Sequence, residues 1–240
     1  MRTVRGHDSS GTKRRVGRPR ADGRSPAADP RDDVLRGAAE LFSRVGYSRA
    51  TTREIAQLAG LRQPSMFHYF RRKEDILAEL LDRTVEPTLE YARLLAAGRA
   101  RPEVKLDALV VTDVRLICSG PFNLTGLYFL PEVRAQRFRS FWTKRQQLFD
   151  YYRSLIRSGC ASRTLVAPSV DLAAELAFGT VESVAIWFDR NAHSADAIAK
   201  VVASSILRSL LRDVGDLEIV SSAGESLRRR IGQPVPPVNA

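Results

Sequence analysis

The sequence is short of cysteine, of histidine and of long apolar runs, and each shortage narrows what the protein can be. Its 240 residues include two cysteines, without CxxC spacing, and three histidines that lie far apart. The sequence therefore argues against a disulfide framework and a zinc site, and predicts a reducing, cytoplasmic setting with no metal. No apolar run approaches the roughly 18 residues of a membrane span, so no membrane association is expected.

Strand-like patterns are lacking too. There is no alternation of apolar and polar residues, no internal repeat and no alternation of strands with helices. Apolar residues recur at helical spacing, which predicts an all-α fold. The expected helices are a first one from Pro30 to Gly46, short ones beginning at Thr51 and Gln63, and runs at 72–97, 102–118, 132–158, 168–189 and 194–214. Pro87 is expected to kink or split the run 72–97.

Acidic residues are scarce near the N-terminus, although the chain as a whole carries a formal net charge of +11. The first 72 residues hold 16 Lys and Arg against 7 Asp and Glu, which gives them +9 of that charge. A basic end on a nearly neutral body indicates a polyanion-binding module attached to a second unit. A basic tail that only aids solubility would explain residues 1–30 but not the basic folded segment after them.

Two short helical patterns adjoin in the segment "TTREIAQLAGLRQPSMFHYF", residues 51–70. Thr51 and Glu54 form a capping box that begins the first, Gly60 supplies the turn, and Gln63 with Pro64 begins the second. Neither helix is long enough to be stable alone, so both must pack on the helix before them. The arrangement predicts a helix-turn-helix, although an ordinary helical hairpin inside a bundle fits the spacing too.

The second of these helices has the features of one that reads DNA. Met66 and Phe70, four residues apart, share a face and are expected to be buried. The residues left to point outward are Gln63, Ser65, His68 and Tyr69. Glutamine pairs bidentately with adenine, serine bonds donors or acceptors, and the major groove is wide enough for a helix.

The segment "RDDVLRGAAELFSRVGYSRATTREIAQLAGLRQPSMFHYFRRKEDILAELL" resembles the DNA-binding domain of the TetR family of transcriptional regulators. The likeness covers residues 30–81, with LFSRVGY, TTREIA, AG, FHYF and the Lys of RRKEDIL in register. It implies an N-terminal three-helix helix-turn-helix domain followed by a larger helical domain for ligand binding and dimerisation.

The resemblance also implies which residues contact DNA. The positions where the family reads bases are Arg53, Gln63, Pro64 and Ser65, and those where it grips phosphates or neighbouring base edges are Thr52, His68, Tyr69 and Lys73. Lys73 lies at a helix N-terminus, where a phosphate binds favourably. The family usually has Tyr where this chain has Phe67, which leaves an apolar contact to sugar or a thymine methyl.

The basic arm contains a second resemblance. Its core, Gly17-Arg18-Pro19-Arg20, resembles an AT-hook in which Val16 replaces the usual first Arg. Arg18 and Arg20 would then enter the narrow minor groove of A/T-rich DNA. The alternative is a generic basic tail that binds phosphates only.

In proteins of this family the last two helices of each chain form the dimer interface. The segments 168–189 and 194–214 are apolar and contain small residues that permit close helix approach, although packing within one chain is the alternative. A dimer would double the short site that one recognition helix reads. The predicted interface residues are Leu172, Leu176, Gly179, Ser183, Ile186, Ile198, Val202, Ser205, Ile206 and Leu210.

An aromatic-rich stretch lies between these helices and the run 72–97. Apolar walls with few polar groups suit a small hydrophobic ligand, although an aromatic stripe at helical spacing is also typical of plain core. The residues predicted to line the pocket are Phe122, Tyr128, Phe129, Phe138, Trp142, Phe149 and Tyr152.

The chain is thus divided into a disordered basic arm (1–29), a helix-turn-helix DNA-binding domain (30–76), a ligand-binding and dimerisation domain (77–215) and a flexible tail (216–240). The predicted function is that of a repressor that binds a palindromic operator as a homodimer and is released by a small hydrophobic ligand. An activator or an architectural protein with the same DNA contacts is the alternative. No phosphate-binding glycine loop or catalytic constellation occurs, so neither enzymatic activity nor a cofactor is expected.

Overall fold

The computed structural model describes residues 29–119, 127–128, 130–189 and 191–234. Across these ranges the chain is helical and has no strand; an isolated bridge joins Leu165 to Leu211. The predicted all-α fold is confirmed. The basic arm with Arg18 and Arg20, and the predicted pocket residues Phe122 and Phe129, lie outside the described residues.

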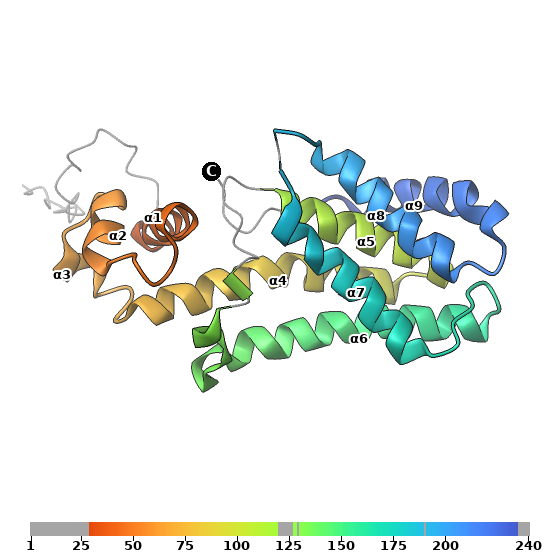
Figure 1. Cartoon of the computed structure of the whole chain (residues 1–240), viewed down its shortest axis with the longest axis horizontal. Helices are drawn as coiled ribbons and strands as arrows, with labels where there is room; N and C mark the ends of the chain where they lie inside the picture. Colours follow the sequence, from red (N-terminus) through yellow and green to blue (C-terminus); the bar gives the residue numbers. More distant parts are fainter. Residues whose placement is uncertain (1–28, 120–126, 129, 190, 235–240) are drawn as a thin grey trace, which may run out of the picture.

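A small group of helices forms one end of the molecule, and α4 runs from it into a larger bundle (Figure 1). The helices are α1 (Pro30–Val45), α2 (Thr52–Leu58), α3 (Gln63–Met66), α4 (Lys73–Ala97), α5 (Pro102–Cys118), α6 (Arg139–Ala161), α7 (Val170–Trp187), α8 (Ala195–Leu210) and α9 (Leu217–Ile231). Short 3-10 turns lie at Pro131–Arg134, Gln136–Phe138 and Val214–Asp216.

The first three helices begin where the sequence predicts. Asp29 caps α1 by accepting a hydrogen bond from the backbone N–H of Arg31. Both halves of the capping box between Thr51 and Glu54 are present at the start of α2. Gly60 has a φ of +68°, a left-handed conformation that favours glycine and permits the tight turn into α3.

The apolar faces of these helices form one small core. Ile55 and Ala56 of α2, Met66 of α3 and the following Phe70 are all buried, as are most apolar side chains of α1. The inward orientation predicted for Met66 and Phe70 is confirmed. Because α3 has only four residues, this packing must hold it in place.

The helix α4 joins the two parts of the molecule without interruption. It runs from Lys73 to Ala97 as one helix with Pro87 inside it, so the predicted alternative of a split at Pro87 does not occur. The predicted domain boundary between residues 76 and 77 falls within α4. The DNA-binding unit and the larger domain therefore share a helix.

The larger domain is built around α5, which packs against α4, α6, α7, α8 and α9. Its apolar residues lie on all sides, which is why neighbours can cover it all round. Within the described ranges, no helix is both long and apolar enough to cross a membrane.

The C-terminal segment differs from the prediction. Residues 217–231 were expected to belong to a flexible tail, but they form α9, which packs on α5. Val220, Gly224 and Leu227 provide a narrow buried strip at helical spacing, and Arg228 pairs with Asp107 of α5 in the interior. The sequence gives little sign of this helix because the strip is short and its ion pair joins residues 121 positions apart.

Candidate DNA-binding surface and regulatory cavities

The predicted DNA contacts gather on the outer side of α2 and α3. Arg53 of α2 is exposed, as are Pro64 and Ser65 of α3, whereas Thr52 and Gln63 are half-buried where the two helices meet. In the turn after α3 the predicted contacts Phe67, His68 and Tyr69 are exposed, with 40% of Phe67 and 38% of Tyr69 accessible. These two aromatic rings face outward although the core next to them is apolar, which suits contact with a partner.

The helix α3, which we call the recognition element together with the turn that follows it, has a single helical turn. Beyond Met66 the backbone continues in hydrogen-bonded turns. The backbone N–H groups of His68 and Tyr69 bond to the carbonyls of Ser65 and Met66, at 3.3 and 2.9 Å. A short element of this kind can be presented only by a rigid support, which the core beneath it supplies.

A side-chain hydrogen bond connects the starts of α2 and α3. The Gln63 Nε2 group donates to the Thr52 hydroxyl oxygen over 2.8 Å. Each is the first residue of its helix, so the bond fixes the side chain of Gln63 relative to α2.

Lys73 differs from the other predicted contacts. Its ammonium group donates to the backbone carbonyls of Tyr47 (2.8 Å), Ala50 (2.9 Å) and Ser48 (3.4 Å), and lies 4.3 Å from the centre of the Tyr47 ring. Burial raises the pKa of Tyr47 to about 12. The three N–H groups of Lys73 are thus engaged within the domain. Lys73 therefore ties the loop after α1 to α4, and its contact with a phosphate stays a prediction.

Two exposed arginines that the sequence prediction omitted extend the basic face. Arg62 precedes α3 and Arg71 follows its turn, and neither forms an ion pair with a described residue. The same holds for Arg53. Arginines without an acidic partner beside the recognition element suit contacts with DNA phosphates. In the sequence, the only sign of this role for Arg62 and Arg71 was the positive net charge of the segment.

A cluster of ion pairs joins α1 to α4. Glu79 of α4 binds Arg31 of α1 and Arg83 of its own helix, and Arg83 also binds Asp32 of α1 at 2.8 Å. Arg31 lies over the ring of Phe70, at 4.4 Å. The helix-turn-helix and the first half of α4 are therefore fastened together.

The predicted pocket residues that the structure describes separate into two groups. Phe149 and Tyr152 of α6 are buried and pack edge-on against Phe178 of α7, at 5.7 and 5.2 Å between ring centres. These two rings are packed in the core, and their place in a ligand pocket stays a prediction. The half-buried Tyr128 and Trp142 both pack against Phe141.

A cavity of about 500 Å³ lies between α4 and the start of α6. Phe138, a predicted pocket residue, is part of its wall together with Phe141. Charged side chains complete it, and they include Glu79, Arg83, Asp82 and Lys144. One oxygen of Asp82 is buried without a hydrogen-bond partner, while the other accepts from Ser140 at 2.9 Å.

A buried carboxyl group lies deeper in this domain. Asp113 of α5 accepts hydrogen bonds from the hydroxyls of Tyr152 (2.8 Å) and Thr88 (3.2 Å). Burial raises its pKa to about 7, although both hydrogen bonds favour the ionised form. Burial and the neighbouring Asp113 also raise the pKa of Tyr152 well above its ordinary value.

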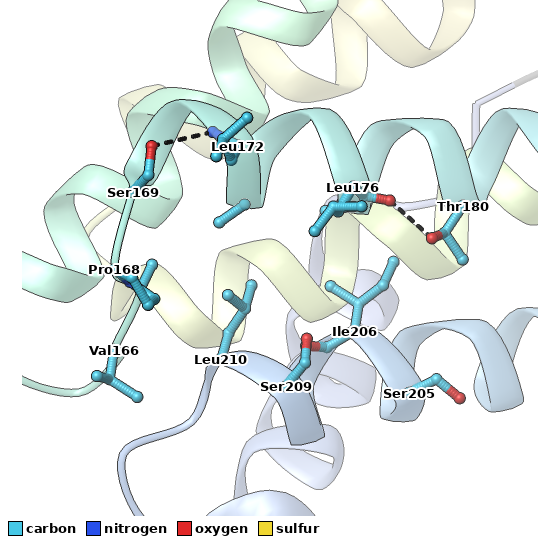
Figure 2. A pocket seen from close by; sticks show the side chains of 13 residues that line it. Val166, Pro168, Ser169, Leu172, Leu176, Thr180, Ser205, Ile206, Ser209 and Leu210 are labelled. Carbon is cyan, nitrogen blue, oxygen red and sulfur yellow. Dashed lines mark hydrogen bonds between the residues drawn. The ribbon is translucent and has the colours of Figure 1, made fainter.

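A second cavity, of about 410 Å³, lies between α7 and α8 (Figure 2). Leu172 and Leu176 of α7 line it from one side, and Ile206 and Leu210 of α8 from the other. Leu172 and Leu176 are 66% and 73% exposed, which makes them two of the most exposed large apolar side chains of the described residues. The described chain leaves this apolar face uncovered.

The ten predicted interface residues divide by exposure. Those that are exposed are Leu172, Leu176, Gly179, Ile186 and Ser205, those that are half-buried are Ser183 and Ile198, and those buried within the chain are Val202, Ile206 and Leu210. The buried three face their own domain first, because α8 packs closely on α5. The exposed residues of α7 make up most of the uncovered face.

Two family models match this chain. Residues 34–80 match the model described as bacterial regulatory proteins, tetR family, and residues 99–210 match the one described as tetracyclin repressor-like, C-terminal domain. The chain belongs to the TetR family. The matches cover the helix-turn-helix and the larger domain, as the resemblance of residues 30–81 implied.

Similar TetR-family chains agree with this assignment. The crystal structure of Mycobacterium smegmatis AmtR is 36% identical and covers 88% of this chain and 99% of its own, with a TM-score of 0.74. The fatty acid metabolism regulator protein of Bacillus subtilis is 26% identical over 75% of this chain and 93% of its own. The transcriptional repressor KstR2 of Rhodococcus jostii is 32% identical over 99 residues, which span 41% of this chain and 48% of its own.

Proposed function

We propose that this TetR-family regulator is a repressor that binds a palindromic operator as a homodimer and leaves it when a small hydrophobic ligand binds. The observation that carries the proposal is the pairing of two surfaces on one chain. An exposed basic recognition surface lies at one end, and an uncovered apolar face lies on α7 in the larger domain. The described residues hold no cluster suited to a metal ion, and no catalytic step is proposed.

The uncovered face on α7 supports the homodimer. Leu172, Leu176 and Ile186 are each at least 66% exposed, and Trp187 is 49% exposed. An exposed apolar patch of this kind marks an interaction site, and a twofold axis lets the same patch cover its own copy. The two recognition surfaces of such a dimer would be related by its twofold axis and would face two equivalent half-sites. We therefore propose that the operator is palindromic.

The ligand is proposed to act from the cavity between α4 and α6. Phe138 and Phe141 provide the apolar part of its wall, but charged side chains make up most of the lining, so a ligand seated there needs a polar or charged group beside its hydrophobic part. Glu79 and Arg83 of this lining also fasten α4 to α1. A ligand that fits this cavity in only one arrangement of α4 would shift the balance between DNA-bound and free forms. It can do so only by its difference in affinity for the two arrangements, typically about 1–3 kcal/mol.

The DNA part of the proposal is tested by sequencing the genomic fragments that the purified full-length protein selects. Enrichment of one palindromic motif supports an operator, while unselective capture of fragments contradicts it. Deleting the gene and measuring a reporter under the selected promoter then separates the repressor from the activator. Expression should rise for a repressor and fall for an activator.

The ligand part is tested by calorimetry with and without saturating operator. The first compounds to titrate are fatty acids, because the similar B. subtilis protein is named for fatty acid metabolism. Linkage requires that operator weakens binding of the ligand by the same factor by which the ligand weakens binding of operator. A ligand whose affinity is unchanged by operator would show that release does not proceed through this coupling.

A further inference from the structure

The hydrogen bond between Thr52 and Gln63 restricts how the chain can read a base. The Gln63 Nε2 group donates to the Thr52 oxygen, so one end of the amide is already engaged before DNA binds. The turn between the two helices is itself held, since the Leu61 N–H donates to the Ala56 carbonyl at 2.8 Å. The bond thus joins two fixed helix starts.

The groups left free on these side chains form a defined pattern. Gln63 retains one amide N–H and its carbonyl oxygen, and Thr52 retains its O–H. In the major groove adenine offers an acceptor at N7 beside a donor at N6, which matches an N–H beside a carbonyl oxygen. Guanine offers acceptors at both N7 and O6, so the Gln63 oxygen would face an oxygen.

We propose that Thr52 is a positioning residue that orients the Gln63 amide so that each half-site is read as adenine at this position. When the Thr52 O–H donates to a backbone phosphate, its oxygen is left to accept from Gln63. The phosphate contact and the base contact are then coupled through one hydroxyl. This inference rests on the proposed function, because it requires the start of α3 to enter the major groove.

The opposite amide orientation defines the competing outcome. If the carbonyl oxygen of Gln63 instead accepted from the Thr52 O–H, the amide would turn its N–H groups outward. These N–H groups would bond best to a base with two adjacent acceptors, so Gln63 would then prefer guanine, with its N7 and O6, at this position. The identity of the preferred base therefore reports the direction of the hydrogen bond.

The test compares binding of operator variants that carry each of the four base pairs at one symmetric position. That position is located as the one at which Gln63→Ala loses discrimination. The unaltered protein is expected to prefer adenine over guanine there by about tenfold or more. Thr52→Val should bring this ratio close to one, and Thr52→Ser should retain it, because serine keeps the hydroxyl.

The measured quantity is the ratio of a variant's affinities for the adenine and guanine operators. Partial unfolding lowers both affinities alike, so it does not imitate a loss of this ratio. Thr143→Val, an exposed position on α6, is the matched control and is expected to keep the preference. A preference for guanine would overturn the inference, as would a Thr52→Val variant that binds all operators more weakly but keeps the ratio. Failure of the unaltered protein to select any sequence would instead overturn the proposed function and this inference with it.

Discussion

At Lys73, one ammonium group holds the loop after α1 against the start of α4. Lys73→Met keeps most of the unbranched side chain but removes its donors, leaving the Tyr47 and Ala50 carbonyls without this partner. We expect the free energy of unfolding to fall by about 1.5–3 kcal/mol, as for hydrogen bonds to charged groups. Chemical denaturation measures the change.

The control for Lys73 is Lys200→Met, which removes an exposed lysine whose partner is Asp196 on the same helix. A surface pair of this kind contributes less than about 1 kcal/mol, so little change is expected. If the Lys73→Met protein is as stable as the unaltered one but binds all DNA more weakly, the result would instead support a contact between Lys73 and a DNA phosphate.

Asp113 makes stability depend on pH in a direction unusual for a carboxyl group. Its pKa of about 7 in the folded protein lies above the ordinary value of about 4, so the folded state holds a proton that the unfolded chain releases. The contribution of Asp113 to the free energy of unfolding is therefore greatest below about pH 4 and is lost as the pH rises towards 7.

Asp113→Asn should remove that decline, because the amide does not ionise and still accepts from Tyr152. Measured between pH 4 and pH 7, the stability of the variant relative to the unaltered protein is expected to rise with pH. Asp171→Asn alters an exposed carboxylate and is the matched control. A constant difference in stability across this range would show that Asp113 is ionised throughout.

At the scale of elements, a buried ion pair helps to hold α9 on α5. Arg228 and Asp107 are each about 5% exposed or less, and Gly224 of α9 leaves room for the Asp107 carboxylate. Burial raises the pKa of Asp107, and the nearby Arg228 guanidinium offsets part of that rise. Removing the arginine alone would leave a carboxylate buried without its cation, which is costly.

Arg228→Leu is therefore expected to lower the free energy of unfolding by about 3–5 kcal/mol. The double variant Arg228→Leu with Asp107→Leu should recover most of this loss, because neither charge then remains. Arg229→Leu, next along α9 and exposed, is the control, with an expected change below about 1 kcal/mol. A double variant no more stable than the single one would contradict this account of how α9 is held.

Structural features that depend on residues close together in the chain, such as helix caps, could be predicted from the sequence. Features that depend on contacts between residues far apart in the chain could not. The caps at Asp29 and Thr51 involve residues within three positions, and the sequence indicated both. Lys73 bonds to carbonyls 23 to 26 positions away, and Arg228 to a residue 121 positions away. The packing of Tyr152 against Phe178 could not be predicted for the same reason, since periodicity shows that a face is apolar but not what covers it.

At the scale of the whole molecule, the uncovered face on α7 is the surface through which we propose that the chain dimerises. Leu176→Glu places a charge at the most exposed leucine of that face, and burying it in a dimer would be unfavourable. We expect light scattering to give the mass of one chain, and operator affinity to fall because one half-site contact is lost. Leu94→Glu, at a 58% exposed leucine of α4, is the control and should leave the dimer intact. A dimeric Leu176→Glu protein would place the interface elsewhere.

Because Glu79 and Arg83 fasten α1 to α4, α4 would act as a lever arm in the proposed dimer. Twenty-five residues at 1.5 Å each make an arm of about 37 Å, with the helix-turn-helix fixed to its tip. A rotation of about 5° at the far end would move the tip by about 3 Å, and two chains swinging in opposite senses would change the separation of their recognition elements by about 6 Å. Half-sites lie about 34 Å apart along DNA, so this displacement is enough to lose register. The four side chains at the joint between α1 and α4 would keep the helix-turn-helix aligned with this arm, so that a small rotation of α4 is expected to change its fit to the operator.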